Sequence, residues 1–191
     1  MRKILLIVII TVILFLMYSF RNPLNDIVQE QYIILKKIDN IEIRQYRKSV
    51  NASYYSDKKA ERNDYFKNLA AYIFGDNTEK KSIEMTSPVT VKLYGKGEMI
   101  FRMPSNYTLD NLPKANNSKI NFITINPCAK AVIKYSGYSN RSIEKKKIQA
   151  LKKTLERENI EHDNKFELLI YNPPFKILNR RNEITVNIIY P

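Results

Sequence analysis

Cysteine, histidine and glycine are scarce in this chain of 191 residues, and each shortage excludes a class of function. One cysteine, Cys128, rules out an intrachain disulfide. Because His162 is the only histidine, the two residues cannot complete a tetrahedral zinc site. Four glycines leave little material for a phosphate-binding loop, and the sequence contains neither G-x-S-x-G nor H-E-x-x-H. We therefore expect a binding protein rather than an enzyme, with no catalytic residues and no metal site.

Acidic side chains are also few, with 19 set against 32 lysines and arginines, for a formal net charge of +13. Such a charge can attract nucleic acid or an anionic membrane. The lysines are spread along the chain, however, and the densest group, residues 145–153, lies between Glu144 and Glu156. This pattern is typical of a solvated helix face, so we expect no nucleic-acid partner.

The longest apolar run stands at the N-terminus. Residues 4–20 carry no charge, Arg21 follows them, and Pro23 ends any helix that begins earlier. A helix of about 20 residues crosses the ~30 Å hydrocarbon layer of a membrane. We therefore expect residues 1–23 to form a single transmembrane helix that acts as a signal anchor.

A cleaved signal peptide is the alternative for this segment. Its apolar core is usually ~7–15 residues long and ends near small residues, and here Ser19 is the only small residue close to the exit. In the anchored form the domain formed by residues 24–191 lies on the exported side of the membrane, and in the cleaved form it is secreted.

The remainder of the chain reads as one structural unit repeated twice. Apolar alternation and turn residues predict strands at 32–38, 41–46, 50–55, 86–94, 99–103, 121–125, 129–135, 167–171 and 183–190, and helices at 59–74 and 141–158. Each half then follows the order strand, strand, helix, strand, strand. We expect an α+β fold in which an antiparallel sheet, closed or nearly closed, carries two long helices on its outside.

Three motifs follow one another in a fixed order. The first joins residues 72–75 to 83–89, which include Ser87-Pro88-Val89. The second, residues 101–113, begins Phe-Arg-Met-Pro-Ser. The third joins residues 171–175, Tyr-Asn-Pro-Pro-Phe, to 180–184, Arg-Arg-Asn-Glu-Ile. Proline cannot donate to a strand ladder, so these motifs are expected mainly to set turns and strand starts.

In this order the motifs resemble the SOUL heme-binding protein family over nearly all of the chain after about residue 30. The resemblance implies a pseudo-two-fold, distorted eight-stranded antiparallel β-barrel with two long packed α-helices. It also implies reversible binding of heme or another tetrapyrrole. The same architecture occurs in effector-binding domains of multidrug-responsive regulators, so the fold alone fixes no ligand. A protein-interaction module without heme and a binder of amphipathic small molecules both stay open, as does the oligomeric state.

The expected ligand site lies between the first helix and the Pro-Pro loop. Its candidate residues are Tyr65, Leu69, Tyr72, Pro173, Pro174 and Phe175. The first three share one helical stripe, and Phe66, Ala70 and Ile73 form the neighbouring stripe. One stripe must face the sheet, and the other can face a ligand. The family typically carries tryptophan after the two prolines, and Phe175 keeps an aromatic stacking face there.

No side chain stands out as an iron ligand. Histidine is the common axial donor, but His162 lies in the polar segment 161–164, which is typical of a solvated turn. Tyr72, Met85 or Tyr171 can also coordinate iron, and nothing in the sequence distinguishes them. We expect a tetrapyrrole to be held by hydrophobic contacts, with lysine or arginine pairing to its propionates.

Overall fold

The computed structural model describes residues 31–56, 62–95, 97–176 and 178–190. The chain divides into two compact units, residues 1–32 and 33–191, and the elements below belong to the second, apart from Tyr32. The expected anchor, residues 1–23, lies outside the described residues. Within the described ranges, no helix has the length and apolar character needed to cross a membrane.

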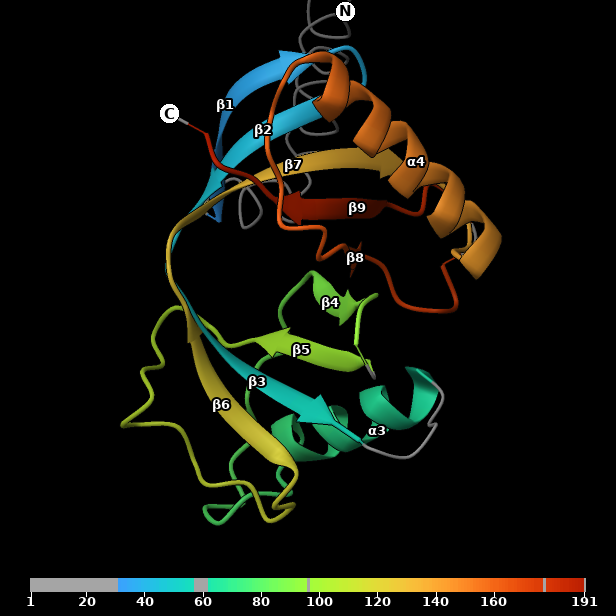
Figure 1. Cartoon of the computed structure of the whole chain (residues 1–191). Helices are drawn as coiled ribbons and strands as arrows, with labels where there is room; N and C mark the ends of the chain where they lie inside the picture. The colour runs from blue at the N-terminus through green and yellow to red at the C-terminus, as the bar shows by residue number, and fades with distance from the viewer. Residues whose placement is uncertain (1–30, 57–61, 96, 177, 191) are drawn as a thin grey trace, which may run out of the picture. The chain divides into compact units, whose positions relative to one another are not determined.

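Nine strands form one antiparallel sheet that curls strongly along its width (Figure 1). The strands are β1 (Tyr32–Ile38), β2 (Ile41–Tyr46), β3 (Ser49–Tyr55), β4 (Val89–Lys92), β5 (Glu98–Arg102), β6 (Ile120–Ile125), β7 (Cys128–Tyr135), β8 (Glu167–Ile170) and β9 (Asn182–Asn187). Their hydrogen-bonded order is β1-β2-β7-β9-β8-β4-β5-β3-β6. The expected eight-stranded barrel is therefore corrected to a nine-stranded half-barrel, open between β1 and β6. The alternation of apolar and polar residues assigns side chains to the two faces of the sheet. It does not determine whether the two edge strands pair and close the barrel.

The sheet order repeats itself outward from its centre. β4 pairs with β8, with Val91 opposite Leu168. From β8 the order runs β9, β7, β2, and from β4 it runs β5, β3, β6. The helices α3 (Arg62–Ile73) and α4 (Arg141–Arg157) follow β3 and β7 respectively. The expected two-fold repeat of strands and helices is thus present as β3-α3-β4-β5 and β7-α4-β8-β9.

Turn residues fix the ends of these elements as their chemistry requires. The side chain of Asn140 accepts a hydrogen bond from the Ile143 backbone N–H (3.0 Å) and caps α4. Gly75, just after α3, has φ of +112°, a conformation that favours glycine. Pro88 directly precedes β4, where its missing N–H removes nothing from the ladder. The Thr86 hydroxyl bridges this turn by donating to the Arg102 carbonyl (2.6 Å).

The two faces of the sheet bury different side chains. α3 packs on β3 and β5, and α4 packs on β7 and β9, over an apolar layer that includes Ile43 and Ile184. The opposite face carries the alternate residues, among them Arg44 and Glu183, which are also fully buried. The curl of the sheet therefore encloses a polar interior, and every buried charge there needs a partner.

Candidate functional site

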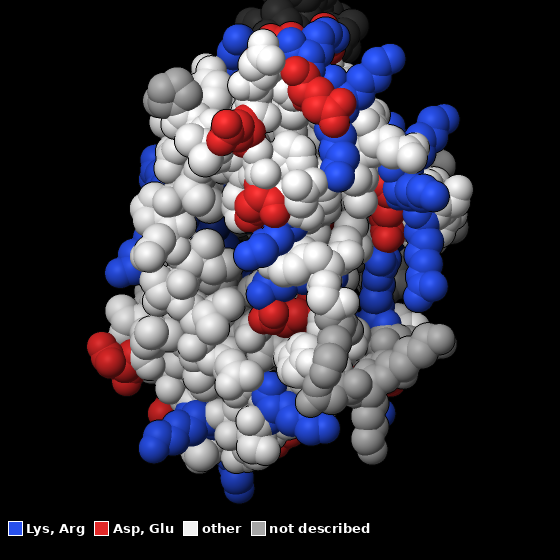
Figure 2. Space-filling model, viewed as in Figure 1, with Lys and Arg blue, Asp and Glu red and all other residues white. Residues whose placement is uncertain are grey.

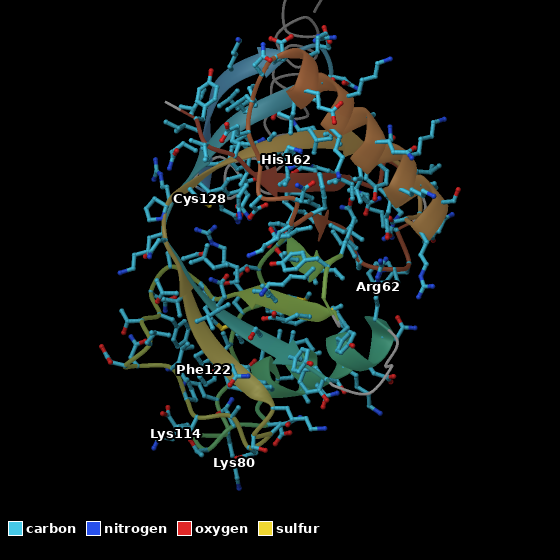
Figure 3. All side chains as sticks on the ribbon, viewed as in Figure 1. Arg62, Lys80, Lys114, Phe122, Cys128 and His162 are labelled. Carbon is cyan, nitrogen blue, oxygen red and sulfur yellow. The ribbon has the colours of Figure 1, made fainter. Side chains whose placement is uncertain are left out.

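The buried face of α3 carries Tyr65, Leu69 and Tyr72, whose side chains belong to the core. They are 5%, 0% and 0% exposed. The Tyr65 ring packs against Tyr54 with ring centres 5.8 Å apart. The Tyr72 ring packs against Phe122 (Figure 3), and its hydroxyl donates to the Pro113 carbonyl at 2.9 Å. Burial raises the pKa of Tyr72 to about 12, so this hydroxyl stays protonated and bonded within the protein.

The neighbouring stripe of α3 is also turned inward. Ala70 and Ile73 are buried, and the half-buried Phe66 packs on Phe101 with ring centres 5.4 Å apart. Both stripes therefore contact protein, because a short helix lying in a curved sheet buries more than one face. Neither of the two stripes faces only solvent.

Pro173, Pro174 and Phe175 lie on the Pro-Pro loop, which we define as residues 172–176 and 178–181 between β8 and β9. All three are exposed, and Phe175 has 83% of its surface accessible. The expected ligand site is therefore divided into two separate groups. The three loop residues are exposed together, whereas Tyr65, Leu69 and Tyr72 are buried between α3 and the sheet.

Arg180 holds the Pro-Pro loop from beneath. It is 7% exposed, and its Nη1 donates to the carbonyls of Pro173, Pro174 and Lys176 at 2.5, 3.3 and 3.0 Å. Its guanidinium also lies 4.6 Å from the centre of the Tyr138 ring. The Tyr138 hydroxyl in turn donates to the Pro174 carbonyl (3.1 Å). One buried cation thereby fixes several backbone groups that have no strand partner.

An ion pair joins the beginnings of the two helices. Arg62, the first residue of α3 (Figure 3), binds both carboxylate oxygens of Glu144 in α4 at 2.7 and 2.8 Å. The hydroxyl of Ser139, the residue after Tyr138, also donates to Glu144 (2.8 Å). Burial on its own would raise the pKa of Glu144. The hydrogen bonds from Arg62 and Ser139 lower this pKa by a larger amount, so the net pKa lies below its usual value. The first turn of α3 is therefore connected to the segment that contacts the Pro-Pro loop.

Glu183 occupies the polar interior of the sheet and is bonded to five donors on three residues. Arg44 donates to it twice (2.8 and 3.0 Å), Arg181 donates through Nε (3.0 Å) and Nη2 (2.7 Å), and Tyr171 donates its hydroxyl (2.9 Å). Burial alone would raise the pKa of Glu183, but the two arginines outweigh it and the net pKa is lowered. Of the sequential pair Arg180-Arg181, which precedes β9, Arg181 meets the carboxylate and Arg180 holds the loop.

A pocket of about 530 Å³ opens at the ends of β3, β5 and β6. The motif after β5 forms most of its wall. The lining residues are Lys48, Ser49, Val50, Arg102, Met103, Pro104, Ser105, Tyr107, Thr108, Leu109, Asp110 and Thr124. Residues 101–113 form the second sequence motif, and no ligand site was expected there. The signal available there was a cation, Arg102, set between apolar residues.

His162, Met85 and Cys128 lie apart from both places. His162 forms an isolated bridge with Ile188, and its Nδ1 accepts a hydrogen bond from the Asn164 backbone N–H (3.1 Å). Met85 is 41% exposed on the approach to β4. Cys128 begins β7, and burial raises the pKa of its thiol. None of the three lines the pocket.

The basic residues of α4 form a solvated helix face. Arg141, Lys145, Lys146 and Lys153 are exposed, and Figure 2 shows blue side chains outnumbering red ones over this helix. Of the α4 acids, Glu144 is buried in its pair with Arg62. The expectation that no nucleic acid binds here stays a prediction.

Comparison with solved structures establishes the fold. A hydrolase from Listeria innocua matches with a TM-score of 0.58 and 8% identity, over 81% of this chain and 94% of that one. The EcmrR C-terminal domain matches with a TM-score of 0.57 and 11% identity, over 79% and 98% of the two chains. An uncharacterized conserved protein from Listeria innocua gives 0.59 and 10%, over 78% and 92%. At these identities the likeness concerns architecture and not activity.

Sequence comparison gives a more specific result. No curated protein sequence matches the chain significantly. Residues 27–187, however, match the family model described as SOUL heme-binding protein. The match covers all three motifs and every strand and helix described above.

Proposed function

Because this chain belongs to the SOUL heme-binding protein family, we propose that it binds a tetrapyrrole reversibly on the Pro-Pro loop. The observation that carries the proposal is an apolar surface held in place by Arg180. Phe175, Leu178 and Tyr138 are 83%, 77% and 54% exposed. Exposed apolar groups that gather on one fixed segment are typical of binding surfaces. A fixed loop also loses less entropy when a ligand binds.

Charges beside this surface suit the propionates of a tetrapyrrole. Lys176 lies on the loop itself, and Arg141, three residues after Tyr138, begins α4. The Arg62 side chain, although paired with Glu144, is 37% exposed. Arginine and lysine pair well with carboxylates at a partly desolvated surface. The segments 138–141 and 172–181 contain no histidine, cysteine or methionine. These residues therefore fit a tetrapyrrole that is bound through its apolar ring and its propionate carboxylates, without an iron ligand of these three types.

Tyr65, Leu69 and Tyr72 have a supporting role in this proposal. Their burial fixes α3 on the sheet, and α3 presents Arg62 toward α4. The surface thus combines Pro173, Pro174 and Phe175 with a helix end rather than with a helical stripe. We further propose that the domain is exported and held at the membrane by residues 1–23, and that it is neither an enzyme nor a nucleic-acid binder.

Titration with hemin, followed by the Soret band, tests the proposal. Phe175→Ala and Leu178→Ala should each weaken hemin binding about tenfold, a loss of about 1.4 kcal/mol, because each removes apolar contact area. Ile33→Ala is the matched control, since Ile33 is also exposed (52%) but lies in β1. It should change the affinity less than twofold, as should His162→Ala.

Two outcomes would contradict this site. Unchanged hemin affinity in both loop variants would exclude the Pro-Pro loop, and loss of the Soret shift in His162→Ala would identify histidine ligation instead. A wild-type chain that gives no Soret shift would favour an interaction module without heme.

A further inference from the structure

The pocket at the ends of β3, β5 and β6 is a second site, separate from the Pro-Pro loop. Its volume of about 530 Å³ falls within the ~300–1,000 Å³ common for small-molecule sites. Residues 102–110 supply most of its wall. None of the lining residues belongs to the Pro-Pro loop or to α3. The proposed tetrapyrrole surface therefore leaves this pocket without a role.

Arg102 differs from the other arginines that are withdrawn from solvent. Arg44, Arg62 and Arg181 each bind a carboxylate at 2.7–2.8 Å, and Arg180 donates to backbone carbonyls. Arg102 is half-buried, yet no carboxylate in the described part of the chain forms an ion pair with it. Burial lowers the pKa of its guanidinium, because removing a charge from water without a partner is unfavourable. An anion bound beside Arg102 would offset this cost.

The remaining lining residues define what kind of anion fits. Lys48 adds a second cation, and Asp110 is the only acid among the lining residues. The pocket therefore carries a net charge of +1, which one carboxylate balances and a doubly charged phosphate exceeds. Met103 and Leu109 supply apolar wall, and Leu109 is 46% exposed at its rim. Apolar area and a planar guanidinium together favour a carboxylate on an apolar body.

We propose that this pocket binds a small amphipathic carboxylate, with Arg102 pairing to the carboxylate and Met103 and Leu109 contacting the apolar body. The site selects anions against cations of the same shape, since a cation would meet Arg102 and Lys48. This inference does not depend on tetrapyrrole binding, because the two sites share no residue.

Calorimetric titration of the full chain with three probes of one shape tests the charge selection. The probes are 4-phenylbutyrate, 4-phenylbutanol and 4-phenylbutylamine. The acid should bind at least tenfold more tightly than the alcohol, and the amine more weakly than the alcohol. Equal affinities for the three probes, or no binding of the acid, would overturn the proposal.

Variants of Arg102 test the assigned partner. Arg102→Gln should remove the preference for acid over alcohol while leaving the alcohol affinity within twofold. Arg102→Lys, which retains the charge, should keep a reduced preference. Arg157→Gln is the matched control at an exposed arginine of α4 and should keep the full preference. A preference for the acid that persists in Arg102→Gln would overturn the assignment.

Methionine methyl resonances locate the bound probe. In a chain labelled with ¹³C at the methionine methyls, phenylbutyrate should shift the Met103 signal and leave that of Met85 unchanged. Met103→Leu assigns the signal. An unmoved Met103 methyl would overturn the proposal. Hemin affinity should be the same in Arg102→Gln as in the wild type. The hemin titration and the phenylbutyrate titration therefore test the two proposed sites independently.

Discussion

At the scale of residues, Glu183 is a carboxylate with no exposed surface, bonded to Arg44, Arg181 and Tyr171. Because its pKa is lowered in the folded protein, it contributes stability that is fully present above the pKa of an unfolded glutamate, about 4.3. That contribution is lost as the pH falls through the folded pKa. Glu42 and Glu144 have lowered pKa values as well, so acid should destabilise this fold.

Glu183→Gln should reduce the free energy of unfolding at pH 7 by about 3–5 kcal/mol, since it leaves a buried arginine without its main counter-charge. The variant should also lose less stability than the wild type between pH 5 and pH 3, because glutamine does not titrate. Urea unfolding at several pH values measures both effects. Glu84→Gln, at an exposed position, should stay within about 0.5 kcal/mol of the wild type. A variant as stable and as acid-sensitive as the wild type would contradict this role for Glu183.

Residue patterns could predict part of this network and not the rest. Side chains two positions apart on an extended chain lie on the same side, and the Arg181 side chain does donate to Glu183. The partner Arg44, 139 positions away, depends on β2 lying beside β7 and β7 beside β9. The pocket at Arg102 was missed for the same reason, because a cation without a partner is recognised only when all its neighbours are known.

At the scale of elements, Arg180 adds side-chain hydrogen bonds to the few backbone hydrogen bonds of the Pro-Pro loop. Arg180→Ala should release the carbonyls of Pro173, Pro174 and Lys176 and let the loop open. Hydrogen bonds to a charged group contribute about 1.5–3 kcal/mol each, and 1.4 kcal/mol already changes a population tenfold. Chymotrypsin should therefore cleave after Phe175 at least tenfold faster in this variant. Arg141→Ala should be cleaved at the wild-type rate, and equal rates in all three proteins would show that Arg180 does not hold the loop.

Local patterns predicted the elements of this fold better than their arrangement. The predicted helix 141–158 is confirmed as Arg141–Arg157, since its cap and apolar spacing are local features. The predicted strand 86–94 is shorter, Val89–Lys92, because Pro88 cannot take part in a ladder. The insertion of β9 between β7 and β8 was not predictable, since strand order depends on contacts between distant segments.

At the scale of the whole molecule, the pairing of β4 with β8 joins the two halves of the sheet. Leu168, opposite Val91 in this pair, is fully buried. Leu168→Ala should cost about 2–5 kcal/mol of unfolding free energy through lost burial and a cavity. Ile33→Ala, at an exposed position in β1, should cost no more than about 0.5 kcal/mol. Urea unfolding measures both, and equal stabilities would mean that this joint is not part of the cooperative core.

The proposed membrane anchor, residues 1–23, can be tested by fractionation. Residues 4–20 form an uncharged run, with Arg2 and Lys3 before it and Arg21 after it. A run of this length is long enough to anchor a chain in a membrane when flanking aromatic residues sit at the interface. The full chain should therefore remain in the membrane fraction after carbonate extraction, whereas a chain that begins at residue 24 should be recovered in solution. Mass spectrometry of the cell-derived protein supplies the second measurement. A mature soluble protein that begins near Asn22 would replace the anchor with a cleaved signal peptide.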